Sequence, residues 1–399
     1  MSFKYIKVKT KGQIEGEILL VPKLRFKEFK DKYMITNINN IAVITMGQSP
    51  NSVNYTSDRS DIILIQGNAD LNNGKIQPRL YTTKITKMCE INDIIMTVRA
   101  PVGDLAITEY KACIGRGVCS IKGSKYLYYY LENFKYKGEW KKLSKGSTID
   151  SITSNDLKNI NVTLPDETEQ EKISNFLSLL DKKIELQKKK IKTLKIYKKG
   201  LSKKLFDKKS NLFFKDCFFH FGGTALEEYV TENAKYRFIS IGNYSSDGTY
   251  IDNGQRINNT GKAKDKILNK NDLVMVLNDK TSQGNIIGST ILIDEDNKYI
   301  YNQRSERIKC NSNIIPKYAW CILNSTNIRN IILKKSQGGT QIYINFHEIE
   351  KLKLYVPSIK EQIKLSNIYY SIVSKLNIED QKLNNLNTLK KSLLQQMFI

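Results

Sequence analysis

The sequence predicts an α+β protein with two mixed α/β domains, each followed by a helix of about 40 residues. Three observations support this prediction. The chain repeats itself at one fixed offset, an apolar pattern with alternating four- and three-residue spacing ends each copy, and short strand-like apolar runs precede that pattern. A chain of 399 residues has room for two domains of ordinary size and for the helices that follow them.

The internal repeat has an offset of 192 residues. Without any gap, this shift aligns Lys125-Tyr126 with Lys317-Tyr318, Gly146 with Gly338, Thr148 with Thr340, Pro165 with Pro357, and Glu169-Gln170 with Glu361-Gln362. Apolar positions between these pairs also coincide. We therefore infer two copies of one structural unit.

The end of each copy has the pattern of a helix that packs on another long helix. Ten positions per copy follow the four-three spacing, and eight of them are apolar in both copies. We expect these apolar positions to form the helix–helix and partner interface: Ile173, Leu177, Leu180, Ile184, Ile191, Leu194, Leu201 and Leu205, and Leu365, Tyr369, Ile372, Leu376, Leu383, Leu386, Leu393 and Met397. The polar exceptions Gln187 and Lys198 coincide with Glu379 and Lys390. Each helix would span roughly 60 Å, which is longer than a compact domain usually needs.

The charge of the chain indicates its class of partner. Lys and Arg number 64 against 40 Asp and Glu, which gives a formal net charge of +24 and a pI near 9.5. Hydrophobic residues make up 40% of the chain, enough to build cores, which argues against intrinsic disorder. Such a positive surplus on a folded protein favours a polyanionic partner, and we expect nucleic acid.

Several other classes of protein are disfavoured. No apolar run reaches the roughly 18 to 20 residues of a membrane span, and the start, MSFKYIKVKTKGQ, lacks the apolar core of a signal peptide. The cysteines Cys89, Cys113, Cys119, Cys217, Cys310 and Cys321 include no C-x-x-C pair, so neither a zinc knuckle nor a disulfide framework is indicated. We therefore expect a cytoplasmic protein with reduced thiols and no membrane association.

The domain boundaries follow from the repeat. We expect a first domain at residues 1–165 with its helix at 166–207, and a second domain at 208–357 with its helix at 358–399. Apolar runs at 62–65, 94–98 and 105–107, and at 273–277 and 290–293, predict strands. An Asn-Asp step, Asn92-Asp93 or Asn271-Asp272, precedes one strand in each copy, and a polar loop follows it. These loops differ in sequence, as expected for two domains that recognise different targets.

Motifs of DNA-modifying catalysis are absent. No two prolines are adjacent, which excludes an Asn-Pro-Pro-Tyr methyltransferase motif, and no G-x-x-x-x-G-K-[ST] loop occurs. Asp166 and Asp181 with Lys182-Lys183 superficially resemble a nuclease signature, but they would lie on one solvated helix face. His220 and His347 lack nearby His or Cys partners, which favours surface or core roles. We expect no catalytic residue, no metal site and no cofactor in this chain.

The order of several short strings identifies a family. The first half contains Val21-Pro22-Lys23-Leu24-Arg25-Phe26, Gly47-Gln48-Ser49-Pro50, Val98-Arg99-Ala100-Pro101-Val102-Gly103, Arg116-Gly117-Val118, Gly146-Ser147-Thr148, Leu164-Pro165 and Glu169-Gln170-Glu171-Lys172-Ile173. The second half contains Asn302-Gln303-Arg304, Gly338-Gly339-Thr340, Val356-Pro357 and Glu361-Gln362. With the duplication and the two helices, the chain resembles the specificity subunits of type I restriction–modification systems over nearly its whole length. The second half departs from the family pattern, because it has no counterpart of Arg99-Ala100-Pro101 and has Asn278-Asp279-Lys280 instead.

The resemblance implies a division of labour. Each target-recognition domain reads one half of a bipartite double-stranded DNA site, and the two helices pack as an antiparallel coiled coil with pseudo-twofold symmetry that sets the spacer. Two methyltransferase subunits, and in complete systems two restriction subunits, assemble around such a subunit for adenine methylation and restriction. S-adenosylmethionine, ATP and Mg are therefore expected on the partners.

The candidate DNA contacts lie in polar and Gly-containing loops, because phosphates accept from Lys, Arg, hydroxyls and backbone N–H groups, and base edges from Arg, Gln, Asn and Lys. In the first domain they are Gly47, Gln48, Ser49, Arg59, Gln66, Asn68, Arg99, Arg116, Lys145, Ser147 and Thr148. In the second they are Gly222, Gly223, Thr224, Asn243, Lys280, Gln283, Arg304, Ser336, Gln337, Thr340 and Gln341. Residues shared by both copies are better suited to phosphate binding or fold support than to base reading.

The outer surfaces of the two helices suggest further contacts, and the sequence also leaves two alternative functions open. The run Lys188-Lys189-Lys190 either lies over spacer DNA or forms an ordinary solvated side, and we favour the solvated side. Leu186, Tyr197, Ile378 and Leu389 broaden the apolar surface beyond the seam, and we expect them to dock helices of the methyltransferase subunits. The alternative functions are a stand-alone DNA-binding or decoy protein and a Mg-dependent nuclease.

Overall fold

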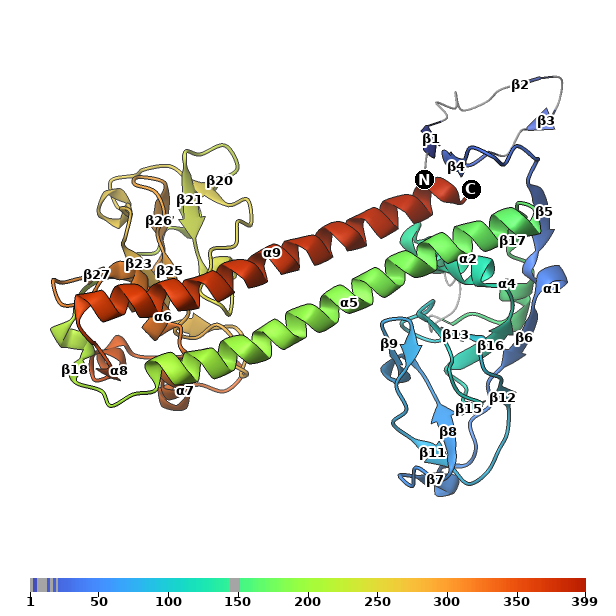
Figure 1. Ribbon diagram of the computed structural model, residues 1–399, viewed down its shortest axis with the longest axis horizontal. Coiled ribbons are helices and arrows are strands. Elements are labelled where there is room, and N and C mark those ends of the chain that lie inside the picture. Colours follow the sequence, from blue (N-terminus) through green and yellow to red (C-terminus); the bar gives the residue numbers. More distant parts are fainter. Residues whose placement is uncertain (1–2, 6–12, 15–16, 19–20, 144–150) are drawn as a thin grey trace. The chain divides into compact units, whose positions relative to one another are not determined.

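The computed structural model describes residues 3–5, 13–14, 17–18, 21–143 and 151–399. The chain divides into two compact units (Figure 1): unit 1 contains Met1–Gln187 and Lys382–Ile399, and unit 2 contains Lys188–Gln381. Each unit is mixed α/β and includes part of both long helices. The predicted α+β class with two repeated domains is confirmed.

Unit 1 is built on two sheets. The larger has the strand order β6 (Val43–Met46), β16 (Val118–Lys122), β13 (Ile94–Thr97), β14 (Leu105–Ile107), β10 (Lys75–Ile76) and β9 (Leu71–Asn72). The second has the order β12 (Met88–Cys89), β15 (Ala112–Ile114), β8 (Ile62–Ile65), β11 (Tyr81–Thr82) and β7 (Tyr55–Thr56). Shorter pairs join β1 (Phe3–Tyr5) to β4 (Leu24–Phe26), β2 (Gln13–Ile14) to β3 (Glu17–Ile18), and β5 (Met34–Asn37) to β17 (Asn161–Leu164). The helices are α1 (Ile38–Ile41), α2 (Lys125–Tyr136), α3 (Glu139–Leu143) and α4 (Ser154–Lys158), with 3-10 helices η1 (Ser52–Asn54) and η2 (Asn68–Asp70).

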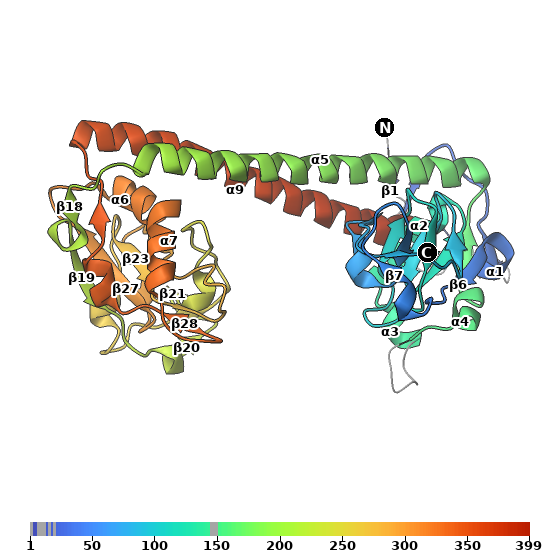
Figure 2. The ribbon, with the colours of Figure 1, turned by 90° about the horizontal axis from the view of Figure 1, so that it is seen from below.

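Unit 2 has two four-stranded sheets. Their orders are β19 (Phe218–Gly222), β27 (Ser305–Cys310), β23 (Leu273–Val276), β25 (Thr290–Leu292), and β20 (Val230–Thr231), β22 (Arg256–Ile257), β21 (Tyr236–Ile239), β26 (Tyr299–Tyr301). Two short pairs join β18 (Leu212–Phe213) to β29 (Lys353–Leu354), and β24 (Asn278–Asp279) to β28 (Ile342–Tyr343). The helices are α6 (Pro316–Leu323), α7 (Thr326–Lys335) and α8 (Phe346–Glu350), with 3-10 helices η3 (Phe214–Asp216), η4 (Glu227–Tyr229), η5 (Ile241–Asn243) and η6 (Lys264–Lys266). Figure 2 shows α6 and α7 between the strands of this unit and α5.

The two units share one topology. The order β6-β16-β13-β14 corresponds to β19-β27-β23-β25, and β15-β8-β11-β7 corresponds to β26-β21-β22-β20. The β8–β15 and β21–β26 pairs are parallel, and the other neighbours in these series are antiparallel. Asn92 and Asn271 also adopt the same positive φ, 73° and 71°, before β13 and β23, a conformation that Asn tolerates better than most residues. The repeat in the sequence is therefore a repeat of the fold.

One segment that the sequence predicts as a loop begins with a short strand. Residues 278–284 are predicted as a loop, but Asn278–Asp279 form β24, which pairs with Tyr343 and Ile342 of β28. Polar residues rarely signal a strand by themselves, and the pairing depends on a segment more than 60 residues away in the chain. This correction places the segment around Lys280 beside the segment that follows α7.

Two long helices follow the repeated domains. α5 spans Glu167–Phe206, 40 residues, and α9 spans Ile359–Met397, 39 residues. The Asp166 carboxylate accepts a hydrogen bond from the Glu169 backbone N–H at 2.9 Å, and Lys203 and Lys204 lie in the last turn, which complements the helix dipole at both ends. The expected helices of about 40 residues are confirmed.

The helices run antiparallel. In unit 1, Ile173 and Leu177 of α5 share a core with Leu393, Leu394 and Met397 of α9. In unit 2, the other ends meet, because Leu205 and Phe206 of α5 share a core with Leu365 and Tyr369 of α9. The start of each helix therefore packs on the end of the other, as an antiparallel seam requires.

Charged groups buried in unit 1 anchor each helix. Arg25 binds Glu169 near the start of α5 through two hydrogen bonds of 2.9 and 2.7 Å, and Tyr33 donates to the same carboxylate at 3.1 Å. Lys390 of α9 binds Glu132 of α2 at 2.8 Å and Asp181 of α5 at 2.7 Å. Burial alone lowers the pKa of Lys390, but the two carboxylates outweigh it and raise that pKa above its ordinary value. Sequence patterns predicted the helices but not these ion pairs.

Candidate nucleic-acid interface

Several predicted DNA contacts of the first domain converge in space. Residues 47–49, 66–68, 98–99 and 115–117, here called loop cluster 1, meet where β6, β8, β13 and β15 end. The Gly47 N–H donates to Val118 O at 3.0 Å, the Gln48 N–H to Ile114 O at 2.9 Å, and the Val98 N–H to Gly117 O at 2.9 Å. The Arg116 N–H donates to the Ser49 hydroxyl at 3.0 Å. Four loops that are separate in sequence therefore form one surface.

Glycine permits this close approach. A Cβ at Gly47 would lie 2.1 Å from the carbonyl oxygen of Gly115, and one at Gly117 would lie 2.1 Å from that of Gln66. Any larger residue at either position would push two loops apart. Gly47 thus supports the geometry of loop cluster 1 rather than binding through a side chain.

Loop cluster 1 carries exposed polar side chains. Gln48, Asn68, Arg99 and Arg116 are exposed, and within the described residues neither guanidinium pairs with a carboxylate. The amide of Asn68 instead donates to Asp104. Arg59 lies at the opposite end of β8 from this cluster, because it precedes the strand while Gln66 follows it. The cluster can present the guanidinium groups of Arg99 and Arg116 and the amide of Gln48 to an anionic ligand.

The predicted loop at Lys145, Ser147 and Thr148 lies outside the described residues. The residues directly after it are described. Ser151 forms a β-bridge with Arg99, and the Ile152 N–H donates to Val98 O at 3.0 Å. These contacts join the segment that follows the loop to loop cluster 1.

The second domain repeats this convergence. Residues 222–224, 277–280, 302–304 and 336–343, here called loop cluster 2, are joined by backbone hydrogen bonds. The Gly223 N–H donates to Ser305 O at 3.2 Å, the Leu277 N–H to Arg304 O at 2.9 Å, and the Ile344 N–H to Leu277 O at 2.9 Å. A Cβ at Gly223 would lie 1.9 Å from Asn302 O, so this glycine also permits a close approach. Thr224 bridges Asn302 and is half-buried.

Most of the other predicted contacts in this domain face solvent. Gly222, Lys280, Gln283, Arg304, Gln337, Thr340 and Gln341 are exposed. The Gln337 and Tyr343 backbones exchange hydrogen bonds of 2.8 and 2.9 Å, which closes the loop between them. Gly338 in that loop has φ 110°, a conformation that side chains disfavour. The Ser336 hydroxyl donates to Ile332 O at 2.9 Å and so caps α7.

Asn243 has a structural position. Its side chain is fully buried, accepts from the Ser240 N–H at 2.9 Å and donates to Ile251 O at 2.9 Å. The equivalent residue in unit 1 is Asp70, which the sequence did not single out. Asp70 accepts from the Gln66 and Gly67 N–H groups at 2.8 and 3.1 Å. Both residues end a 3-10 helix and stabilise the turn before it, a capping pattern that a polar third residue can signal.

An acidic residue missed in the sequence orders loop cluster 2. Glu227 accepts from the Asn302 amide at 2.8 Å and from the Leu226 N–H at 3.0 Å. Burial alone would raise its pKa, but these hydrogen bonds and the nearby Arg304 hold the pKa of Glu227 below its ordinary value. Glu227 is therefore charged near pH 7 and holds the loop that carries Arg304.

The predicted interface positions on the helices lie toward the interior. Buried positions are Ile173, Leu177, Leu180, Ile184, Ile191, Leu205, Leu365, Tyr369, Leu376, Leu393 and Met397, and partly buried ones are Leu194, Leu201, Ile372, Leu383 and Leu386. Leu186, Tyr197, Ile378 and Leu389 are instead exposed, at 56, 56, 51 and 47%. The helices thus have an inner apolar seam and separate outward-facing apolar positions.

The acidic and histidine candidates for catalysis have structural partners. Asp166 caps α5, and Asp181 binds Lys390 and accepts from the Tyr129 hydroxyl at 3.0 Å. His220 lies 2.7 Å from Glu306 and stacks on Phe346, and His347 lies 3.2 Å from Glu350. The described residues bring together no group of three or more His, Cys, Asp or Glu that could hold a metal ion. In the same parts of the chain, no helix has the length and apolar character needed to cross a lipid bilayer.

Comparison with known proteins agrees with this architecture. The family model for the type I restriction modification DNA specificity domain matches residues 30–195 and again residues 215–388. The putative type I restriction enzyme MjaX specificity subunit of Methanocaldococcus jannaschii is 34% identical over 203 residues, which is 49% of this chain and 47% of that protein. The MjaVIII specificity subunit of the same organism is 28% identical over 295 residues, 67% of this chain and 68% of that protein.

A solved structure has the same fold. The S subunit of a type I restriction–modification system from M. genitalium superposes with a TM-score of 0.64 at 18% sequence identity, covering 95% of this chain and 99% of that one. The chain aligns with about half the length of the MjaX protein, whereas the family model accounts for most of this chain in two matches. The resemblance drawn from the sequence motifs is confirmed: this protein belongs to the family of type I restriction–modification DNA specificity subunits.

Proposed function

We propose that this chain supplies the DNA sequence specificity of a type I restriction–modification complex. The domains at residues 1–165 and 208–357 each read one half of a bipartite double-stranded target, and the helices at 166–207 and 358–399 set the distance between the halves. The observation that carries this proposal is the pair of loop clusters. Equivalent loops converge on equivalent folds in both units, but their exposed side chains differ, as expected of two readers with different targets.

Residue roles follow from the same comparison. Arg99 and Arg116 in loop cluster 1, and Lys280 and Arg304 in loop cluster 2, have the exposure and charge for phosphate or base contacts. Gln48 and Gln341 can donate to and accept from base edges. The glycines and Asn243 support loop geometry, because their atoms are engaged within the fold. Lys145, Ser147 and Thr148 are proposed contacts by analogy with residues 337–340, to which the 192-residue offset relates them.

The catalytic steps are assigned to partner subunits. Two methyltransferase subunits would supply S-adenosylmethionine-dependent adenine methylation, and two restriction subunits would add ATP- and Mg-dependent cleavage. Leu186 and Ile378 are equivalent in the repeat, as are Tyr197 and Leu389, and all four are exposed. Each unit contains one member of each pair, Leu186 and Leu389 in unit 1 and Ile378 and Tyr197 in unit 2, which supports one methyltransferase docking site per unit.

Exchange of one recognition domain tests the proposal. Replacement of residues 208–357 by the corresponding domain of another family member should change one half of the methylated motif and leave the other half intact. The assembled complex is expressed in cells, and its modified-base motif is determined by methylome sequencing, with the unexchanged chain as control. If both halves change, the two domains do not read independently and the proposal is wrong.

Substitution of the exposed apolar positions tests the docking sites. Leu186→Ser and Ile378→Ser should each reduce the methyltransferase content of the complex from two copies to one, because each removes apolar contact area at one site. The molar mass of the purified complex is measured by light scattering, and Lys192→Ser, an exposed change on the same helix as Leu186, serves as control. A complex of unchanged mass in both serine variants would contradict the docking assignment.

A further inference from the structure

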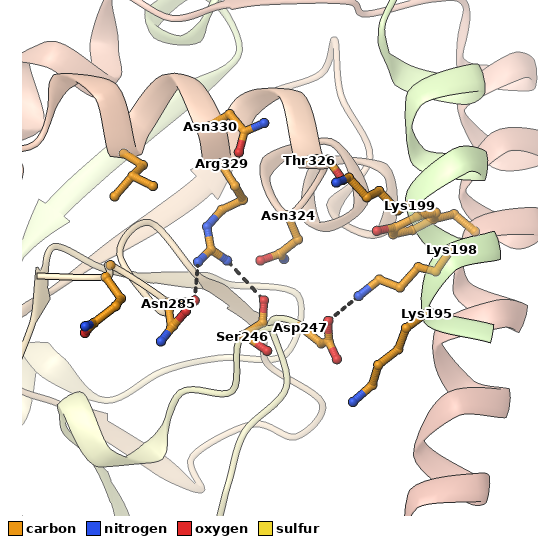
Figure 3. A pocket seen from close by; sticks show the side chains of 14 residues that line it. Lys195, Lys198, Lys199, Ser246, Asp247, Asn285, Asn324, Thr326, Arg329 and Asn330 are labelled. Carbon is orange, nitrogen blue, oxygen red and sulfur yellow. Dashed lines mark hydrogen bonds and ion pairs between the residues drawn. The ribbon is translucent and has the colours of Figure 1, made fainter. Parts of the chain in front are cut away.

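A cavity in unit 2 lies between the C-terminal part of α5 and α7 (Figure 3). Its volume is about 400 Å³, which falls within the usual range of small-molecule sites. Lys195, Lys198 and Lys199 of α5 line one side, and Arg329 of α7 lines another. The loops at 246–247 and 283–285 complete it. None of the family motifs in the sequence falls on this cavity, and Gln283 is the one predicted DNA contact among its lining residues.

The lining is strongly cationic. Asp247 is the one carboxylate among the lining residues, and it binds Lys198. Within the described residues, Lys195, Lys199 and Arg329 pair with no carboxylate. Figure 3 shows the Lys195 and Lys198 side chains extending from α5 toward the loop that carries Asp247. Three positive charges therefore remain without a partnered negative charge.

Among these charges, Arg329 has the strongest need for a counter-anion. Its guanidinium donates to the backbone carbonyls of Ser246 at 3.3 Å and Asn285 at 3.0 Å, which are dipoles rather than counter-charges. Its buried Nε has no hydrogen-bond partner among the described residues. Burial lowers the pKa of Arg329 to about 10, although Asp247 and Asp279 act in the opposite direction. A desolvated guanidinium without an anion is unfavourable, and a bound anion would relieve it.

The repeat shows how the two units differ here. Lys198 is equivalent to Lys390 of unit 1, which binds both Glu132 and Asp181. The positions equivalent to these two carboxylates in unit 2 are Asn324, which lines the cavity, and Val373. Unit 2 therefore keeps the lysine but lacks both acids, and Arg329 stands at the position of Lys137 in unit 1. An ion-paired site in one copy corresponds to a cationic cavity in the other.

We propose that this cavity binds a phosphate group, with Arg329 on one wall and with Lys195 and Lys199 on the facing helix. A phosphate matches three unpaired cations and several neighbouring amide and hydroxyl donors better than a carboxylate, because it offers more acceptor oxygens and up to two negative charges. The group can come from a soluble phosphate compound or from a DNA backbone. The second source rests on the proposed function, whereas the first does not.

The test uses the full chain and two probes. Pyrophosphate is titrated by calorimetry at low ionic strength, and binding of a short duplex is measured by fluorescence anisotropy. Lys195→Gln/Lys199→Gln removes two exposed lysines of the cavity and should leave the fold intact, and Arg329→Gln removes the half-buried guanidinium. The matched control, Lys192→Gln/Lys203→Gln, removes the same charge from exposed positions of the same helix outside the cavity.

The expected result is a loss of affinity of about tenfold or more in the cavity variants and little change in the control, since each lost charge-assisted contact contributes on the order of 1.5 kcal/mol. A loss of affinity for pyrophosphate alone identifies a soluble phosphate compound as the ligand, and a loss of affinity for the duplex alone identifies a phosphate of the DNA backbone. Equal behaviour of Lys195→Gln/Lys199→Gln and its control with both probes overturns the proposal. A chain that fails to read DNA but retains pyrophosphate binding would remove the proposed function and leave the cavity assignment standing.

Discussion

Glu169→Gln is expected to lower the free energy of unfolding of unit 1 by about 3–5 kcal/mol, the usual cost of breaking a buried ion pair. The side chains of Arg25 and Glu169 are 5% and 0% exposed, so the variant leaves a guanidinium buried without its counter-charge. Tyr33 also loses its charged acceptor. Because the pair joins residues 144 positions apart, its loss should also loosen the start of α5.

The chain offers its own probe and control for this measurement. Its two tryptophans report different units, since Trp140 lies in the core of unit 1 and Trp320 in the core of unit 2. Denaturant unfolding followed by Trp140 fluorescence in a Trp320→Phe background reports unit 1 alone, and Trp320 fluorescence in a Trp140→Phe background reports unit 2, which contains Glu361. Glu361→Gln, at the equivalent position of α9, removes a half-exposed partner of Lys208 at 3.5 Å and should cost less than about 1 kcal/mol. If Glu169→Gln and Glu361→Gln lower the free energy of unfolding by similar amounts, burial of the Arg25–Glu169 pair does not explain its stabilising effect.

Lys390→Met is expected to destabilise unit 1 by about 3 kcal/mol near pH 7, because it leaves two carboxylates without their cation. Burial already raises the pKa of Glu132, and loss of Lys390 will raise it further. A carboxyl whose pKa is raised by folding contributes stability at low pH and loses it as the pH rises through the folded-state pKa. The destabilisation should therefore be largest at neutral pH and shrink as the pH falls and Glu132 takes up a proton.

Two further variants separate this explanation from simple loss of packing. Lys198→Met removes the equivalent lysine of α5, whose partner Asp247 is one-third exposed, and should cost about 1 kcal/mol or less. The double variant Lys390→Met/Glu132→Gln should regain much of the stability lost in Lys390→Met, because it removes the buried charge that the single variant leaves behind. Urea unfolding at pH 5 and pH 7.5 measures both effects, followed by Trp140 fluorescence for the Lys390 variants of unit 1 and by Trp320 fluorescence for Lys198→Met in unit 2. A double variant as unstable as Lys390→Met would contradict the electrostatic account.

Local sequence patterns determined the elements of this protein. The four-three apolar spacing predicted the long helices α5 and α9, because helix periodicity is a pattern among neighbouring residues of the chain. The 192-residue offset identified the duplicated fold, and the short apolar runs identified β8, β13, β14, β23 and β25. The family followed from the order of motifs along the chain, which requires no knowledge of their contacts.

The tertiary structure decided which residues meet. Loop clusters 1 and 2 form because strand order and the mixture of parallel and antiparallel pairing bring separate loops together, and this order is not encoded in any local period. Asn243 looked like a surface loop residue, yet the sheet around it buries its amide. The different partners of Lys390 and Lys198 likewise became visible only when Glu132, Asp181 and Asp247 were placed beside them. Long-range contacts of this kind depend on how helices and strands pack in three dimensions, which the periodicity and spacing of residues do not specify.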